Sequence, residues 1–119
     1  MPISESFRPE IVLVSCGFDA ADGDLLGEMR VTPNGFAAMT SRLKTLAGGR
    51  CVLALEGGYN LEAISRSAAA CLRVLLGDDS EQRSVGSASA AGSEAIASVL
   101  AAQRPFWPDL AESLAEREP

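Results

Sequence analysis

Two side chains in this sequence have reactive groups and follow short apolar stretches that could be strands. Asp19 follows Gly17 directly after a short apolar stretch, and Tyr59 follows Gly57 and Gly58 directly after a second one. A carboxylate can bind a metal ion, and a phenol can donate a hydrogen bond to an oxygen that becomes negative during a reaction. If the two stretches are neighbouring parallel strands, both groups lie at one edge of a sheet, where open α/β sheets bind ligands.

Each of these residues also has a simpler role that the sequence leaves open. An aspartate after a strand often caps a turn or a helix, and a tyrosine often packs with its hydroxyl satisfied. Gly57 and Gly58 permit close approach of a phosphate to the backbone, although neither a dinucleotide fingerprint nor a phosphate-binding loop is present. Plain turn chemistry and a small phosphate-binding α/β protein therefore stay as alternatives.

The composition restricts which site can be complete. Among 119 residues there is no histidine, so the commonest metal ligand and the commonest proton carrier near neutral pH are both missing. Cys16, Cys51 and Cys71 are far apart, which predicts free buried thiols rather than a disulfide framework or a cysteine zinc site. Asp22 and Asp24 share a loop with Asp19, but their spacing excludes a calcium-binding helix–loop–helix.

Charge and hydropathy exclude further classes of function. The formal net charge is −6, and no block of Lys or Arg is interleaved with aromatic residues, so we expect no direct nucleic-acid binding. No apolar run is long enough for a membrane span, and the N-terminus lacks the pattern of a secretory signal. We expect an intracellular protein, in the nucleus or the cytoplasm.

The elements that position the two groups are predicted by the apolar pattern. Continuous apolar runs at residues 11–15 and 51–55 predict parallel strands covered on both faces. Between them, Thr32 and Pro33 predict the start of a helix that ends before Gly48. A second helix from Asn60 is predicted to place one apolar stripe against the core and to end at a left-handed Gly77; the stripe consists of Leu61, Ile64, Ala68, Cys71, Leu72 and Leu75. The fold class is therefore α/β.

The domain organisation is predicted to be incomplete. Two short strands leave open edges, so the chain is expected to complete a larger sheet supplied by residues or partners that the sequence lacks. Residues 79–92, rich in Ser, Gly and Ala, predict a flexible linker or loop. Residues 93–119 predict a C-terminal helical segment that starts near Ser93, with a second helical piece from Pro108.

Several segments resemble the C-terminal part of the catalytic domain of class II histone deacetylases. They are residues 9–20 (PEIVLVSCGFDA), 23–27 (GDLLG) and 53–61 (LALEGGYNL), with looser similarity at residues 104–110 (RPFWPDL). The resemblance assigns residues 1–78 to that part of the domain. It implies a partial three-layer α/β/α sandwich with a parallel sheet, of the arginase and deacetylase type.

The resemblance also implies roles for individual residues. Asp19 matches the last of three Zn²⁺ ligands, and Tyr59 matches the phenol that polarises the acetyl carbonyl and stabilises the tetrahedral oxyanion. Gly57 and Gly58 would line the channel for the lysine side chain. Leu26 would lie at the channel rim, where an apolar residue favours acyl-lysine over polyamine substrates. The implied reaction is hydrolysis of N-acetyl-lysine amides on histones or other proteins.

The sequence departs from the family pattern in two respects. Leu25 stands where the family usually has proline. More importantly, the paired histidines and the other two zinc ligands would precede Met1, so we predict that this chain alone is inactive. The expected partners are an acetylated protein and the rest of the deacetylase domain or another deacetylase. The alternative is a non-catalytic remnant that acts as an interaction or regulatory module.

Overall fold

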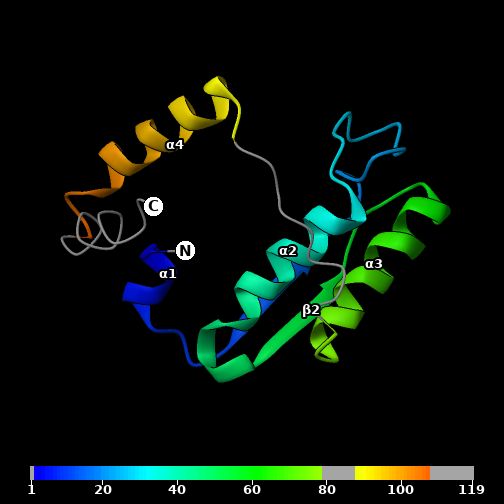
Figure 1. The fold of residues 1–119 in the computed structure, drawn as a ribbon, viewed down its shortest axis with the longest axis horizontal. Coiled ribbons are helices and arrows are strands. Elements are labelled where there is room, and N and C mark those ends of the chain that lie inside the picture. The colour runs from blue at the N-terminus through cyan, green and yellow to red at the C-terminus, as the bar shows by residue number, and fades with distance from the viewer. Residues whose placement is uncertain (1, 79–87, 108–119) are drawn as a thin grey trace. The chain divides into compact units, whose positions relative to one another are not determined.

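The computed structural model describes residues 2–78 and 88–107. Their elements are α1 (Pro2–Phe7), β1 (Val12–Cys16), α2 (Pro33–Lys44), a 3₁₀ turn (Leu46–Gly49), β2 (Cys51–Leu55), α3 (Leu61–Leu75) and α4 (Ala90–Gln103) (Figure 1). The chain forms two compact units, Glu10–Val85 and a second unit made of Met1–Pro9 and Gly86–Pro119. No helix within the described ranges has the length and hydropathy to cross a bilayer.

The two strands form a parallel sheet. β1 pairs with β2 in a register that joins Val12 to Cys51 and Cys16 to Leu55. β2 has the predicted bounds, whereas β1 begins and ends one position later than the predicted run at residues 11–15. The connection through α2 is the β-α-β unit that a parallel pair requires. The predicted class, a partial α/β fold with a parallel sheet, is confirmed.

Helix α2 begins as its sequence predicts. Thr32 adopts an extended backbone and its hydroxyl oxygen accepts a hydrogen bond from the N–H of Gly35 at 3.2 Å, with Pro33 in the first turn. Met39 has helical spacing with Phe36, yet its side chain is 48% exposed and lies outside the core. Thr40 is buried in its place and donates its hydroxyl to the carbonyl of Phe36 at 2.9 Å.

Helix α3 has the predicted ends but buries a different stripe. The Asn60 side-chain oxygen accepts from the N–H of Ala63 at 3.0 Å, and Gly77 after the helix has φ +91°. Leu61 and Leu72, predicted to face the core, are exposed. The helix packs on α2 through small side chains, so its buried positions are Ser67, Ala70, Cys71 and Val74.

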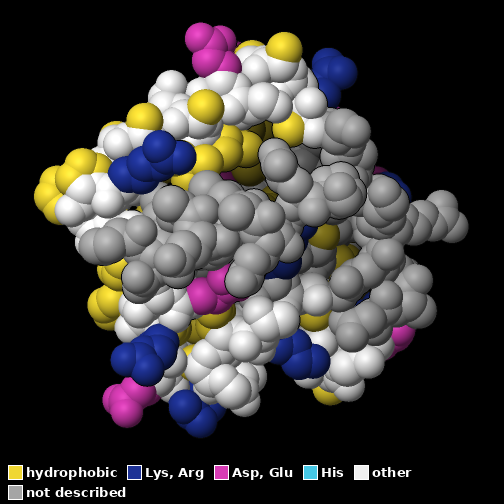
Figure 2. Space-filling model, turned by 60° about the vertical axis from the view of Figure 1, so that its left-hand side comes forward, with side chains coloured by type: hydrophobic (Ala, Val, Ile, Leu, Met, Phe, Trp, Pro, Cys, Tyr) yellow, Lys and Arg dark blue, Asp and Glu magenta, His cyan; other side chains and the backbone are white. Residues whose placement is uncertain are grey.

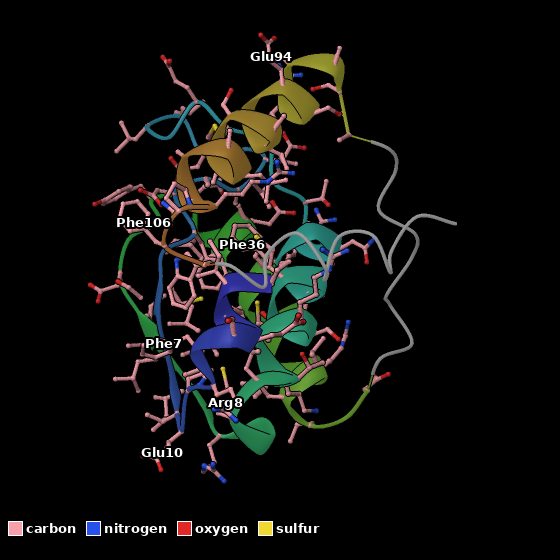
Figure 3. All side chains as sticks on the ribbon, turned by 90° about the vertical axis from the view of Figure 1, so that its left-hand side faces the viewer. Phe7, Arg8, Glu10, Phe36, Glu94 and Phe106 are labelled. Atoms are coloured by element: carbon pink, nitrogen blue, oxygen red, sulfur yellow. The ribbon has the colours of Figure 1, made fainter. Side chains whose placement is uncertain are left out.

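The core lies between the sheet and these two helices. Phe36 points from α2 toward the strands (Figure 3), and its ring meets that of Phe18 edge to face with centroids 5.0 Å apart. Cys71 from α3 completes this cluster, and Cys16 and Leu53 from the strands pack against it. One face of the sheet is therefore covered by α2 and α3.

The other face of the sheet is open. Leu13 and Val52, which are partners in the strand register, are 72% and 52% exposed. Apolar side chains accordingly reach the surface of the molecule (Figure 2). Among the described residues of the unit Glu10–Val85, the two long helices both lie on the same side as Phe36, so the cover predicted for the second face does not come from them.

The second unit contains α1, which the sequence pattern did not predict, and α4. Helix α4 is capped by the Ser89 hydroxyl, which accepts from the N–H of Gly92 at 3.1 Å, and it starts at Ala90, ahead of the predicted start at Ser93. None of its side chains is buried. The helical piece predicted from Pro108 and most of the predicted linker lie outside the described residues.

Candidate active site

The strand pairing continues beyond the ends of β1 and β2. The N–H of Glu56 donates to the carbonyl of Cys16 at 3.1 Å, and the N–H of Phe18 donates to the carbonyl of Gly57 at 2.8 Å. These two bonds keep the two backbone segments side by side beyond the ends of the strands. Asp19 follows immediately after Phe18 and Tyr59 shortly after Gly57, so both emerge at the carboxyl edge.

Gly57 marks the point at which the two side chains meet. A Cβ placed on Gly57 would lie 3.7 Å from the Oδ2 atom of Asp19 and 3.9 Å from the hydroxyl oxygen of Tyr59. The carboxylate and the phenol therefore face one vacant position, and their separation is at most the sum of these two distances. The predicted convergence of the two groups at one sheet edge is present in the structure.

The Asp19 carboxylate is available for a ligand. Asp19 is exposed, and its carboxylate has no hydrogen-bond or ion-pair partner within the described residues. A Cβ placed on Gly17 would come within 3.0 Å of its Oδ1 atom, so Gly17 also leaves room for this carboxylate. Within residues 2–78 and 88–107, no group of three metal-binding side chains is present. Asp19 can supply one ligand but not a complete site.

Gly58 shapes the backbone that carries Tyr59. Its φ is +130°, a conformation that only glycine adopts without strain, and a Cβ there would lie 2.8 Å from Cγ1 of Ile64. Phe18 closes the other side, with its Cβ 3.2 Å from the same position. Tyr59 itself is 68% exposed, so side-chain packing contributes little to its placement.

The loop after Asp19 folds back on itself. An isolated parallel bridge joins Ala21 to Val31, and the N–H of Val31 donates to the carbonyl of Ala20 at 2.9 Å. Gly27 lies so close to Asp19 that an added Cβ would collide with the Asp19 carbonyl carbon and oxygen. The position of the Asp19 backbone thus depends on the absence of a side chain at residue 27.

Asp24 is the buried carboxylate of this loop. It is 5% exposed, and its Oδ2 atom accepts from the N–H of Tyr59 at 2.7 Å. Its Oδ1 atom accepts from the N–H of Leu26 at 2.8 Å and of Gly27 at 3.3 Å. The bond from Tyr59, followed by that from Leu26, holds the pKa of the Asp24 carboxyl below its ordinary range, against the opposing effect of burial.

Leu26, the predicted rim residue, lies in this same turn. Its side chain is 69% exposed, and its backbone shares the Asp24 carboxylate with the backbone of Tyr59. Asn60 adds a second connection between the loops, because its side-chain amide donates to the carbonyl of Gly23 at 2.8 Å. The structure therefore brings all five predicted residues, Asp19, Leu26, Gly57, Gly58 and Tyr59, to one edge of the sheet.

An apolar hollow of about 280 Å³ lies apart from these groups, between the strands and α3. It is lined by Cys16, Phe18, Leu53, Leu55, Ala68, Cys71, Leu72 and Leu75. Burial raises the pKa of the Cys16 and Cys71 thiols, which keeps both protonated near neutral pH. The hollow therefore offers no thiolate nucleophile near neutral pH.

The sequence patterns did not predict the structural role of Asp24, and for Asn60 they predicted the helix cap but not the hydrogen bond to the carbonyl of Gly23. Both hold together two loops that are far apart in the chain, and no local pattern reports such a contact. One local signal was available for Asp24. Aspartate in a turn often accepts hydrogen bonds from backbone N–H groups two or three residues later, as Asp24 does from Leu26 and Gly27. The turn-capping role considered for Asp19 belongs to Asp24.

The sequence of this chain matches one family of known proteins. A model of the histone deacetylase domain matches residues 1–75. Histone deacetylase 15 of Arabidopsis thaliana is 47% identical over 115 residues, covering 95% of this chain and 21% of that protein. The chain belongs to the histone deacetylase family. Its relatives also include the mouse polyamine deacetylase HDAC10, 44% identical over 118 residues, covering 97% of this chain and 17% of that protein.

Solved structures of histone deacetylases show the same fold. The HD domain of HDA15 is 46% identical, with a TM-score of 0.86 over 98% of this chain and 31% of that one. The histone deacetylase Clr3 is 40% identical, with a TM-score of 0.79 over 89% of this chain and 18% of that one. The predicted family and the partial deacetylase fold are thus confirmed. The chain spans about a fifth of the length of the Arabidopsis relative.

Proposed function

We propose that this chain forms one edge of the active site of a protein lysine deacetylase. The observation that carries the proposal is that the Asp19 carboxylate and the Tyr59 hydroxyl face the same vacant position at Gly57. Metal-assisted amide hydrolysis needs a metal ligand beside the reacting carbonyl and a hydrogen-bond donor aimed at the oxygen that becomes negative. Asp19 and Tyr59 supply one of each.

The side chains of this chain can supply one ligand of a zinc site. Catalytic zinc sites use three protein ligands and keep a position open. Asp19 provides one oxygen ligand, and the 119 residues contain no histidine to provide another or to carry protons. Zinc bound by a complete ligand set would supply Lewis-acid polarisation. The remaining ligands and the proton carriers must come from outside this chain, so we predict that the isolated chain does not hydrolyse acetyl-lysine.

The residues of this chain would bind and orient the substrate. The Tyr59 hydroxyl donates a hydrogen bond to the carbonyl oxygen, Gly57 leaves room for the acetyl-lysine amide, and Leu26 lies at the rim with an apolar side chain. The substrate class is an acetylated histone or another acetyl-lysine protein. Polyamine deacetylation is the competing use of the same site, because the relatives include enzymes named for each substrate.

The open face of the sheet favours a partner for this chain. Leu13 and Val52 are exposed on paired strands, and a sheet face of this kind is normally covered in an α/β fold. The rest of a deacetylase domain, or a second deacetylase, is the cover that we propose. A non-catalytic interaction module that binds through the same face is the second candidate function. Acetyl-lysine turnover by the assembled protein separates the two.

The substitution Gly57→Ala tests the vacant position directly. The added methyl makes only ordinary contacts with Asp19 and Tyr59, and the backbone of Gly57 is not in the left-handed region. We therefore expect stability within about 0.5 kcal/mol of the wild type, as for substitutions that create no strain. Hydrolysis of an acetyl-lysine peptide by the assembled domain should nevertheless fall at least tenfold, because the methyl fills the space that the amide needs.

Two further variants serve as references for this test. Tyr59→Phe removes the donor and should lower kcat by roughly 10²- to 10³-fold. Gly58→Ala introduces backbone strain and a clash with Ile64, so it should cost about 1–3 kcal/mol in the free energy of unfolding. Full activity of Gly57→Ala would remove the proposed substrate position. Turnover by the isolated chain that Tyr59→Phe abolishes would contradict the need for outside ligands.

A further inference from the structure

Tyr59 has few contacts that fix its position. Its side chain is 68% exposed, and the ladder from the sheet ends with the bond between Phe18 and Gly57. Helix α3 begins only at Leu61, after its cap Asn60. Gly58 and Tyr59 therefore form a short bridge between sheet and helix, and an exposed phenol on such a bridge needs a backbone anchor to hold one orientation.

That anchor is the carboxylate of Asp24. Its Oδ2 atom accepts the N–H of Tyr59 at 2.7 Å, while its Oδ1 atom holds the N–H groups of Leu26 and Gly27. A carboxylate that accepts several backbone N–H bonds away from water makes strong, charge-assisted bonds. One buried side chain thus ties the backbone of the phenol to the turn that packs against Asp19 through Gly27.

We propose that Asp24 is a positioning residue of the deacetylase site, which acts through the backbone of Tyr59 to hold the phenol beside the Asp19 carboxylate. This proposal deepens the proposed function and rests on it for its catalytic consequence. The atoms nearest the vacant position at Gly57 belong to Asp19 and Tyr59 and not to Asp24, so we assign Asp24 no contact with the substrate. Its effect is on the orientation of the donor.

Asp22 provides a matched control in the same loop. It is exposed and carries the same charge, and its carboxylate has no hydrogen-bond or ion-pair partner among the described residues. Asp22→Asn and Asp24→Asn therefore change the net charge equally. Only Asp24→Asn removes a carboxylate that accepts the N–H of Tyr59.

The first experiment measures the anchor without using activity. Tyr59 is the single tyrosine of the chain, so tyrosine labelled with nitrogen-15 gives one backbone amide signal. Amide exchange in the full chain should be roughly tenfold or more faster at Tyr59 in Asp24→Asn and in Asp24→Ala, as expected when a local opening becomes easier. Exchange in Asp22→Asn should match the wild type. If the Asp24 variants unfold globally, Asn60→Asp is measured in their place. This variant keeps the α3 cap but loses the amide bond to Gly23, so amide exchange at Tyr59 then reports on the same bridge between sheet and helix.

The second experiment asks whether the anchor acts through the phenol. Asp24→Asn, Tyr59→Phe and the double variant are compared for kcat and KM on an acetyl-lysine peptide, in the domain completed by its partner. If Asp24 works through Tyr59, Asp24→Asn lowers kcat with little change in KM, and the double variant is no slower than Tyr59→Phe. A general structural role would make the two losses multiply.

The outcomes separate this proposal from the proposed function. Unchanged tyrosine exchange in both Asp24 variants, or multiplying losses of kcat, overturns the positioning role and leaves the deacetylase assignment intact. Faster exchange, combined with no hydrolysis of acetyl-lysine by the domain completed by its partner, keeps the anchor but overturns the deacetylase function. Faster exchange together with non-additive losses of kcat supports both.

Discussion

The two faces of the small sheet differ although the sequence makes both apolar. Phe36 and Cys71 pack against Cys16 and Leu53 on the face under α2 and α3. On the opposite face, Leu13 and Val52 are neighbours in the strand register and remain largely exposed. The apolar pattern of the strands is typical of a sheet that is covered on both faces, whereas the unit Glu10–Val85 covers one face.

The same contrast holds at the carboxyl edge. This chain contributes a carboxylate, a phenol and the glycine that separates them. It contributes no histidine, and within the described residues no group of three metal ligands. Under the proposed function, the cover for the open face of the sheet and the remaining metal ligands would come from the same source.

The largest predicted effect compares one side chain from each face. Phe36→Ala removes a buried ring that meets Phe18 edge to face, so it should cost about 3–5 kcal/mol in the free energy of unfolding. Leu13→Ala changes an exposed side chain and should stay within about 0.5 kcal/mol. Urea unfolding of the isolated chain measures both. Equal losses would mean that the outer face is covered within this chain.

A pair of charges on the outer face sharpens the comparison. Leu13→Lys combined with Val52→Glu places opposite charges on register partners, which a solvated face tolerates. In the isolated chain this variant should unfold within about 1 kcal/mol of the wild type and bind less of an apolar dye. The same pair should prevent assembly with the rest of the domain, measured as loss of co-purification. Normal assembly would show that the partner lies elsewhere.

Acid provides the smallest and most local test. The Asp24 pKa is lowered in the folded state, so its stabilisation is complete above the ordinary aspartate pKa of roughly 3.9 and is lost as the pH falls through the lower folded-state value. Between pH 7 and about 5 the urea midpoint difference between wild type and Asp24→Asn should be constant, and below about 4 it should shrink. The covered face, which is apolar, should respond to acid only through the loss of this anchor. A difference that grows toward low pH would have the wrong sign.

Much of the fold follows from local signals. Thr32 and Asn60 cap helices exactly where a side-chain oxygen precedes a helical pattern, and Gly77 ends α3 in the left-handed region. The meeting of Asp19 and Tyr59 follows from parallel strands that end at one edge. Their chemical roles remain predictions.

Other features depend on contacts between distant segments. Met39 and Leu72 have the spacing of core residues, yet α2 and α3 approach each other through smaller side chains and leave both exposed. The Asp24 carboxylate joins residues of two loops, and only the folded backbone brings Tyr59 within 2.7 Å of it. Periodicity reports which residues are apolar, but not which of two apolar stripes meets a neighbour.

The packing of Gly27 on the Asp19 carbonyl has a consequence for natural variation. Residue 27 holds no reactive atom, yet any replacement, however small, displaces the main chain under the carboxylate. A saturation screen would rank this glycine alongside the chemical groups themselves. Tolerance at that position is set by steric room and not by reactivity, so a damaging allele there would mimic the loss of the Asp19 side chain.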